Sequence, residues 1–451
     1  DYYDLTLTRH RVLGGSSHKW AGWSRPMDAL DFERRSWVPE SGWPVSYEEM
    51  QPYNADAAAL CQLESEQWSP TADTALPPLY LKPFVGGDVE VALWQGSPPT
   101  KFGITYRDQL EASTQISTFI DATAIEVITD SAGKAVSSVA VASVGGNRFT
   151  VKARIVVLAA GAMETARLLL ASRSSNPAGL ANENDLVGRY FMEHPHLVTG
   201  HIRLFPRNRA SRPPLAALDK GITGARARLA LQRPAGSMKV AYTVARARQE
   251  ADHLLNFSTH FRTVSPVSRE DSDAYQAFKL AVGNLRSPRR FWQQIRTRSL
   301  PEGVGPLAVR LLKGAPEIFS VVYHEALRRP RELALYTQSE QSPHRDSRIT
   351  LDDTRRDALG VPRLRLDWQL SRLDKESVVK AQAIVGKQLE IAGVGTLVPG
   401  EAFTRDDADW GTNLRGGHHH LGTTRMAEDE THGVVDPSGQ AHTVANLYVA
   451  D

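Results

Sequence analysis

The sequence has only one cysteine, Cys61, among its 451 residues. A single cysteine excludes an intrachain disulfide framework, and it cannot supply the ligands of a thiolate zinc site or of an iron–sulfur cluster. One cysteine also fits a reducing compartment, so we expect a cytoplasmic protein. The lack of a visible secretion signal adds nothing to this expectation, because the chain opens on Asp1 rather than on a methionine.

Long apolar runs and a strong excess of one charge are also absent. No stretch approaches the ~18 uninterrupted apolar residues of a membrane-spanning helix. The formal net charge is only +2, so we expect no nucleic-acid partner. Hydrophobic residues make up 41% of the chain and charged residues 23%, which is typical of a globular protein with two or three domains at this length. Nothing in the sequence indicates an oligomeric state.

The pattern of apolar residues predicts an α/β protein. Residues 119–129 and 136–144 alternate between apolar and polar side chains, and the turn at residues 130–133 joins them as a hairpin. Residues 155–160 are continuously apolar, which predicts a strand buried on both faces of a layered sheet. Gly161 ends this strand and a helix follows, so backbone N–H groups should lie at the carboxyl edge of the sheet, where cofactors bind.

The middle of the chain has a different pattern of predicted strands and helices. Residues 240–245 and 255–261 are typical of strands, whereas residues 374–392 carry apolar side chains at helical spacing. Further helices are expected at residues 274–282 and 307–327. We therefore predict a layered, Rossmann-like α/β cofactor domain built from both ends of the chain. An α+β substrate domain with an antiparallel sheet is expected to be inserted in it.

The most specific signal lies near the end of the chain. Residues 416–426 read Gly-Gly-His-His-His-Leu-Gly-Thr-Thr-Arg-Met, and residues 446–451 read Asn-Leu-Tyr-Val-Ala-Asp. These segments resemble the C-terminal signature of the glucose–methanol–choline (GMC) oxidoreductases, which oxidise alcohols with FAD. The active-site histidine of that family stands three residues before a Gly-Thr pair, so the resemblance places this role on His419. It also implies that Ala450 and Asp451 lie along the flavin.

Three further segments resemble GMC motifs in the order expected for the family. The stretch from Gly14 to Pro26 is similar to one that packs beside the flavin ring, and Gly161 with the helix after it is similar to one at the adenosine end. Residues 188–195 resemble the GMC motif at which the chain leaves the FAD-binding domain and enters the substrate domain. The resemblance implies flavin contacts by Gly14, Gly15, Ser16, Ser17, Trp20, Ala124 and Gly161.

The resemblance also implies how the chain is divided. Residues 1–35, 116–196 and 411–451 would form the FAD-binding domain, residues 36–115 a connection or lid, and residues 197–410 the substrate-binding domain. GMC proteins begin with a Gly-x-Gly-x-x-Gly turn that cradles the pyrophosphate, and this chain contains no such run. A second active-site His or Asn follows the histidine signature in the family. We expect the N-terminal βαβ unit with its glycine turn to lie outside this sequence. We expect the same of the second active-site residue.

A histidine suits the reaction that the resemblance implies. An alcohol loses its hydroxyl proton as hydride moves to flavin N5, and an imidazole within hydrogen-bond reach can accept that proton. Three adjacent histidines could instead bind a metal, but extended neighbours point to alternate faces and no supporting ligand spacing appears, so we expect no metal. His418, His420 and Thr423 are then interpreted as substrate neighbours or structural residues. His194 and His196 are interpreted as satisfied loop histidines.

Within the family, residues 14–31 and the histidine run look most similar to bacterial sugar-oxidising members such as pyranose oxidases and glycoside 3-dehydrogenases. This similarity implies a sugar, glycoside or polyol as substrate, with O₂ or a quinone-like compound as electron acceptor. Pyranose oxidases attach FAD through a histidine directly before the matching tryptophan. Here Lys19 precedes Trp20, so we expect non-covalent FAD.

Other interpretations stay open at this stage. The acidic cluster at residues 406–409 could hold an amino sugar, although a solvated loop is the plainer interpretation. GMC proteins include lyases that act without net redox chemistry, and the missing glycine turn leaves room for a non-catalytic relative without flavin. Flavin bleaching by an alcohol, without any acceptor, would exclude both.

Overall fold

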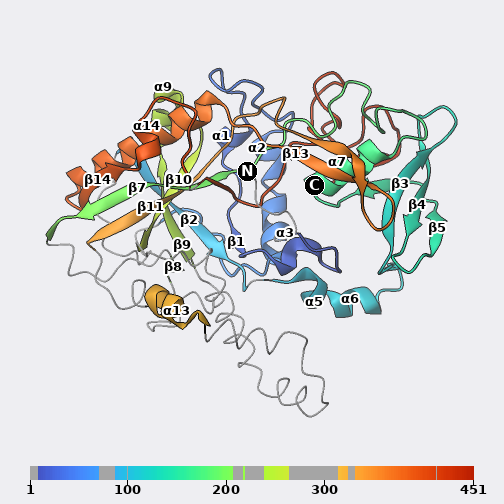
Figure 1. The fold of residues 1–451 in the computed structure, drawn as a ribbon, viewed down its shortest axis with the longest axis horizontal. Coiled ribbons are helices and arrows are strands. Elements are labelled where there is room, and N and C mark those ends of the chain that lie inside the picture. The colour runs from blue at the N-terminus through green and yellow to red at the C-terminus, as the bar shows by residue number, and fades with distance from the viewer. Residues whose placement is uncertain are drawn as a thin grey trace, which may run out of the picture.

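The structure, a computed structural model, describes residues 9–70, 87–98, 100–206, 217–218, 238–263, 313–322, 331–412 and 414–451. Figure 1 shows a large sheet with a long helix at one end of the molecule, and a small sheet with a shorter helix at the other. The C-terminus lies beside the shorter helix. This arrangement has the two-part α/β organisation that the apolar pattern predicts.

The larger part is built on a nine-stranded sheet with the order β1-β2-β9-β10-β11-β7-β14, in which β8 also pairs with β9 and β15 with β7. Neighbouring strands are antiparallel. The strands are β1 (Trp23–Ser24), β2 (Val89–Gly96), β7 (Pro195–Leu204), β8 (Ala217–Leu218), β9 (Met238–Val244), β10 (Phe257–Thr263), β11 (Glu332–Ser339), β14 (Gly395–Pro399) and β15 (Arg415–Gly416). The strands predicted at 240–245 and 255–261 are confirmed as β9 and β10.

One face of this sheet is covered by α14 (Arg372–Ile391), which confirms the helix predicted at 374–392. Ser371 begins the helix, because its hydroxyl accepts the Asp374 N–H while the Asp374 carboxylate accepts the Ser371 N–H. The apolar residues Ala381, Val385 and Leu389 of α14 join the core beneath the strands. Side chains alternate along a strand, so the opposite face of the sheet is left to a different set of residues.

The smaller part surrounds α7 (Ala162–Ala171). It contains the antiparallel sheet β3 (Thr123–Thr129), β4 (Val136–Ala142) and β5 (Arg148–Val151), and the hairpin β12 (Arg348–Arg356) and β13 (Pro362–Asp367). The strand β6 (Val156–Leu158) pairs in parallel with β16 (Leu447–Val449). These elements confirm the predicted β3–β4 hairpin and the strand-glycine-helix order around Gly161.

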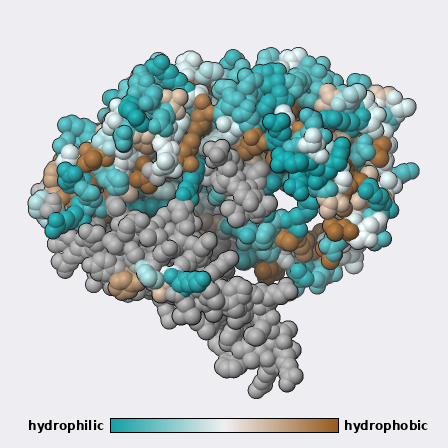
Figure 2. All heavy atoms as spheres, in the orientation of Figure 1, coloured by the Kyte–Doolittle hydropathy of each residue, from teal (hydrophilic) through white to brown (hydrophobic). Residues whose placement is uncertain are grey.

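The burial predicted for residues 155–160 is wrong. Ile155 is 60% exposed and Val157 55% exposed, whereas Leu158 is buried. The described elements cover only the side of β6 that bears Leu158, and β16 is the neighbour with which β6 pairs. Exposed apolar residues are not confined to this strand, because Figure 2 shows hydrophobic residues scattered among hydrophilic ones on the face in view.

Short helices complete the described structure. They are α1 (Ala29–Phe32), α2 (Tyr47–Met50), α3 (Tyr53–Leu60), α5 (Phe102–Thr105), α6 (Arg107–Ala112), α9 (Arg246–Asp252) and α13 (Ala315–Val322), with the 3₁₀ helices η2 (Gly15–His18) and η5 (Glu401–Phe403). The helix α13 lies within the range predicted at 307–327, while residues 274–282 fall outside the described residues. Among the helices described, none is long and apolar enough to cross a membrane.

Candidate active site

The first part of the site is the edge where β6 and β16 end. Because these strands are parallel, the residues that follow them meet at one edge of the sheet. The Gly161 N–H donates a hydrogen bond to Asp451 Oδ1 over 2.8 Å, and the Ala450 N–H donates to the Leu158 carbonyl. Burial raises the pKa of the Asp451 carboxyl, and hydrogen bonds from Thr165 and Gly161 oppose this shift. The fold thus brings together three expected flavin contacts, Gly161, Ala450 and Asp451.

Gly161 gives this edge an open backbone. Its φ of 82° and ψ of 146° belong to a region that is essentially restricted to glycine. A Cβ placed there would meet nothing within 4 Å, so conformation rather than crowding requires the glycine. An open backbone at a helix start, at the carboxyl ends of parallel strands, is the setting in which dinucleotide cofactors bind. The residues present therefore fit FAD.

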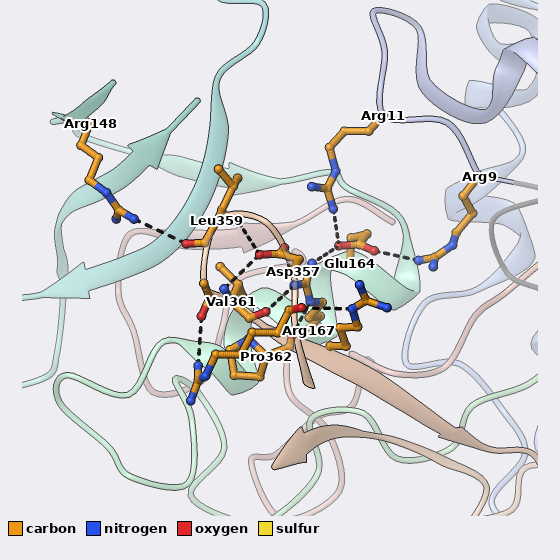
Figure 3. Close-up of polar contacts among 12 residues, drawn as sticks. Arg9, Arg11, Arg148, Glu164, Arg167, Asp357, Leu359, Val361 and Pro362 are labelled. Atoms are coloured by element: carbon orange, nitrogen blue, oxygen red, sulfur yellow. Dashed lines mark hydrogen bonds and ion pairs between the residues drawn. The ribbon is translucent and has the colours of Figure 1, made fainter. Parts of the chain in front are cut away.

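An ion-pair cluster fixes the start of α7, as Figure 3 shows. Glu164 accepts hydrogen bonds from Arg9 Nη1 over 2.8 Å and from Arg11 Nη2 over 3.3 Å. Arg167 donates to the same Glu164 carboxylate and, through Nη2, to Asp357 Oδ2 over 2.7 Å. The N-terminal segment and the β12–β13 hairpin are thereby tied to the helix that begins at Gly161.

The glycine-serine stretch near the N-terminus folds as η2 against α5. A Cβ on Gly14 would lie 2.0 Å from the Gly103 nitrogen, so the two backbones cross at contact distance. The Ser17 hydroxyl donates to the Gly14 carbonyl and accepts the Phe102 N–H. The Trp20 indole N–H donates to the Thr100 carbonyl over 2.7 Å. Ser17 and Trp20, two expected flavin contacts, therefore have hydrogen-bond partners within the protein.

Three other expected flavin contacts are open. A Cβ on Gly15, whose φ is 53°, would meet nothing within 4 Å, and Ser16 is exposed. Ala124 is exposed on β3 opposite Val141 of β4. It belongs to the three-stranded sheet and not to the β6–β16 edge.

The second part of the site is the histidine segment, which the buried carboxylate of Glu193 holds. Glu193 Oε2 accepts the N–H groups of Gly417 and His419 over 2.9 and 3.2 Å, and Oε1 accepts that of His418 over 3.0 Å. The same Oε1 lies 3.1 Å from His420 Nε2, and the Glu193 side chain is completely buried. One carboxylate therefore sets the path of the backbone through all three histidines.

Thr423 and Gly422 attach this segment to the cofactor edge. The buried Thr423 hydroxyl donates to the Ala162 carbonyl over 2.7 Å, directly after Gly161. A Cβ on Gly422 would lie 2.0 Å from the Tyr190 carbonyl oxygen, and φ there is 90°, so this position requires glycine. The sequence left Thr423 open between substrate contact and structure, and its hydroxyl is engaged in this attachment.

His419 lies at the end of a chain of hydrogen-bonded rings. Its Nδ1 is 2.5 Å from His194 Nε2, and His194 Nδ1 is 2.9 Å from His196 Nε2. His196 Nδ1 is in turn 2.9 Å from the Tyr336 hydroxyl. His194 and His196 were expected to be loop histidines without a part in the site, and the structure instead joins both to His419. Their signal was present in the sequence, because His194 lies within the motif at residues 188–195 and His196 directly follows it.

The surroundings of these rings favour neutral imidazoles. Burial lowers the pKa of His194 to about 3, helped by the neighbouring His419 and against the attraction of Glu193. Burial also lowers the pKa of His196 well below its ordinary value. The pKa of His419 is lowered by burial, with Glu193 opposing the shift and His420 adding to it. His419 is nevertheless an exposed residue, so part of it is accessible from outside the chain.

The two neighbours of His419 have different surroundings. His418 is exposed with a left-handed φ of 67°, and its backbone N–H is held by Glu193. His420 is packed between the Glu193 carboxylate and the Phe191 ring, whose centroid is 5.6 Å away. His420 therefore supports the segment, while His418 lies on its exposed side.

Neither the metal nor the amino-sugar interpretation gains support. No group of three or more His, Cys, Asp or Glu in the described part of the chain could hold a metal ion. Asp407 Oδ1 accepts from Lys375 Nζ over 2.8 Å, and Arg405 pairs with Asp409 over 2.7 Å. Asp406 faces Arg372. The carboxylates at 406–409 thus pair with cations of the protein itself, as expected of a loop.

We expect Gly417→Ala to displace His194 from His419. The new Cβ would lie 2.3 Å from His194 Cε1, while the φ of Gly417 is not in the left-handed region. A misplaced ring should slow anaerobic flavin reduction about 10- to 100-fold. Gly145→Ala is the matched control, because its Cβ would make only a 3.7 Å contact with Ser143 Oγ. Equal rates for the two variants would show that the His194 contact has no part in the reaction.

Comparison with known proteins agrees with this fold. Family models described as GMC oxidoreductase match residues 104–196 and 343–451, which include α7, Glu193 and the histidine segment. Over these segments the chain is similar to the GMC oxidoreductases, a family of enzymes, and it has their α/β fold. The recognition made from the motifs is therefore confirmed.

Several proteins of known activity are similar to the chain. A 2-methyl-1,2-propanediol dehydrogenase of Mycolicibacterium austroafricanum is 23% identical over 486 residues, covering 97% of this chain and 75% of the relative. Pyridoxine 4-oxidase from Mesorbium loti has a similar fold, with a TM-score of 0.54, 16% identity, and coverage of 98% of this chain and 79% of that one. A fungal aryl-alcohol oxidase gives a TM-score of 0.54 at 15% identity, covering 98% and 81%.

Proposed function

We propose that this protein uses FAD to oxidise a hydroxyl of a sugar, glycoside or polyol to a carbonyl, with His419 accepting the hydroxyl proton. The observation that supports this role most directly is the position of His419. Glu193 holds its backbone, His194 engages Nδ1 of its ring, and one side of the residue remains exposed. An imidazole held in this way and neutral at pH 7 is suited to accept a proton.

FAD bound here would supply the acceptor for the hydride. The residues that fit it are the open backbone at Gly161, with Ala450 and Asp451 beside it, and the open segment at Gly15 and Ser16. Thr423 sets the distance between this edge and the histidine segment through its bond to Ala162. The contacts expected for Gly14, Ser17, Trp20 and Ala124 stay predictions, as does the division into FAD-binding, connecting and substrate-binding segments.

The substrate class rests on the resemblance of residues 14–31 and 416–426 to sugar-oxidising enzymes. The relatives compared above act on a propanediol, pyridoxine and aryl alcohols, so an alcohol donor is the common element. A screen of sugars, glycosides and simple alcohols for anaerobic bleaching of bound flavin tests the proposal. Bleaching by sugars or glycosides supports it, and bleaching by simple alcohols alone overturns the sugar class. Complete lack of bleaching favours the lyase or the flavin-free alternative.

The electron acceptor and the location stay predictions. Readmitting air after bleaching distinguishes the two acceptors, because an enzyme that uses O₂ recovers its flavin colour at once. An enzyme that uses a quinone-like acceptor needs that compound for rapid recovery. A cytoplasmic location rests on the single cysteine alone.

We expect FAD to be bound without a covalent bond. Lys19 is exposed at the position where covalent relatives carry a histidine. The neighbouring His18 already engages the Leu13 carbonyl through Nε2 over 3.0 Å. Acid precipitation should therefore release all flavin into the supernatant, measured by its absorbance. Yellow colour that stays in the pellet would contradict this expectation.

Gly161→Ala is expected to reduce FAD content. Alanine at this φ and ψ costs about 1–3 kcal/mol of backbone strain, and a moved Gly161 N–H would also leave Asp451. Gly360→Ala is the control, because Gly360 has a φ of 85° and equally open space but lies in the β12–β13 turn. Both variants should lose stability, whereas only Gly161→Ala should lower the ratio of flavin to protein. Equal flavin ratios would place the cofactor elsewhere.

A further inference from the structure

The chain of rings behind His419 continues into the polar face of the nine-stranded sheet. Gln338 on β11 stands directly opposite His196 on β7 in the strand register. Gln338 Nε2 is 2.8 Å from His196 Nε2, and Lys239 Nζ on β9 donates to Gln338 Oε1 over 2.9 Å. A lysine ammonium and a glutamine amide are thus connected to the ring that supports His194. Neither residue contacts His419 itself.

Lys239 decides which way the Gln338 amide faces. An ammonium group can only donate hydrogen bonds, so the amide oxygen must point to Lys239 and the NH₂ group to His196. A nitrogen that faces the NH₂ group at 2.8 Å must be an acceptor. His196 Nε2 therefore carries a lone pair, and the proton of this neutral ring sits on Nδ1. From there it is donated to the Tyr336 hydroxyl over 2.9 Å.

The same reasoning carries along the next two rings. His194 Nδ1 lies 2.9 Å from the same His196 Nε2, so it must be the protonated nitrogen, and its N–H shares the one lone pair of that atom with the Gln338 NH₂ group. His194 Nε2 is then an acceptor, and His419 Nδ1 at 2.5 Å must be its donor. With one proton on each neutral ring, this is the order that gives every contact a donor and an acceptor, and the lone pair of His196 Nε2 serves two donors. The remaining nitrogen of His419, Nε2, is left with a lone pair.

We infer that Lys239 and Gln338 set the tautomer of His419 through His196 and His194, which leaves Nε2 of His419 as the proton-accepting atom. Gln338 is a positioning residue in this scheme, because it acts through other groups and not on the substrate. The inference rests on the proposed role of His419 only for its effect on rate. The tautomer itself follows from the contacts between neutral rings.

Gln338→Glu tests the inference by reversing the direction of donation. A carboxylate can only accept, so His196 Nε2 must now carry a proton, while pairing with Lys239 keeps the new charge compensated. His194 would then donate from Nε2, and His419 would hold its proton on Nε2. In ¹⁵N spectra of the FAD-loaded full-length protein, His419 should change from the Nδ1–H to the Nε2–H form. The flavin-reduction rate should fall by at least about 10²-fold, because the accepting atom is lost.

Gln338→Leu is the matched variant. It removes the amide donor without supplying an acceptor, so His419 should show a mixture of both tautomers and a smaller loss of rate. A purely structural role for Gln338 predicts the opposite order, because leucine removes the contact with Lys239 and glutamate keeps it. An unchanged Nδ1–H form of His419 in Gln338→Glu would overturn the inference. If the His419 tautomer inverted in Gln338→Glu without any loss of the flavin-reduction rate, the result would support the inference and contradict the role of His419 as base.

Discussion

Replacing His419 by alanine is expected to lower the rate of anaerobic flavin reduction by about 10²- to 10⁴-fold, the contribution of a positioned general base. The fold should survive, because Glu193 binds the His419 backbone N–H and not its ring. Stopped-flow absorbance of the bound flavin measures the rate. His432→Ala is the control, since His432 is an exposed histidine of the same C-terminal region that pairs with Asp429.

The pH dependence gives a second measure of His419. Burial lowers the pKa of the ring, and the neutral form is the one that accepts a proton. The rate should therefore rise with pH through a midpoint below 6.5 and be flat at neutral pH. His419→Ala should lose this rise together with the rate. A His419→Ala enzyme that keeps both would exclude His419 as the base.

Replacing Glu193 by glutamine is expected to cost about 2–4 kcal/mol of unfolding free energy, because hydrogen bonds to a buried charged acceptor are lost. Three backbone N–H groups share its two oxygens. An amide offers one oxygen and turns an NH₂ group toward the remaining donors. Urea unfolding followed by tryptophan fluorescence measures the loss, and flavin reduction should slow because the histidine segment moves.

Glu332→Gln is the matched control for Glu193. Glu332 pairs with Arg203 across β11 and β7, but its side chain is 42% exposed. Exposed ion pairs contribute at most about 1 kcal/mol, so this variant should unfold close to the wild type. If Glu193→Gln were equally harmless, the carboxylate would not be what holds the histidine segment.

Elements with a strong local pattern were predicted well from the sequence. The helix α14 follows from apolar residues at helical spacing, and the β3–β4 hairpin from alternation on both sides of a turn containing Gly133. Both patterns express contacts that lie close along the chain, so they can be recognised before the fold is known. The burial of β6 could not be predicted in this way, because the exposure of Val157 depends on which elements lie over the strand.

The sequence by itself gave the resemblance to the GMC oxidoreductases, the reaction class and the prediction of His419 as the base, because the spacing of histidine, glycine and threonine is local information. The meeting of Gly161 and Asp451 came from the structure, because it depends on the parallel pairing of β6 with β16. Only the tertiary structure decided what supports His419. His194 lies 225 residues before it in the sequence. Gln338 is connected to His419 only because β11 pairs with β7, which places Gln338 opposite His196. A hydrogen-bond chain of this kind depends on atomic distances between distant segments, which no spacing in the sequence encodes.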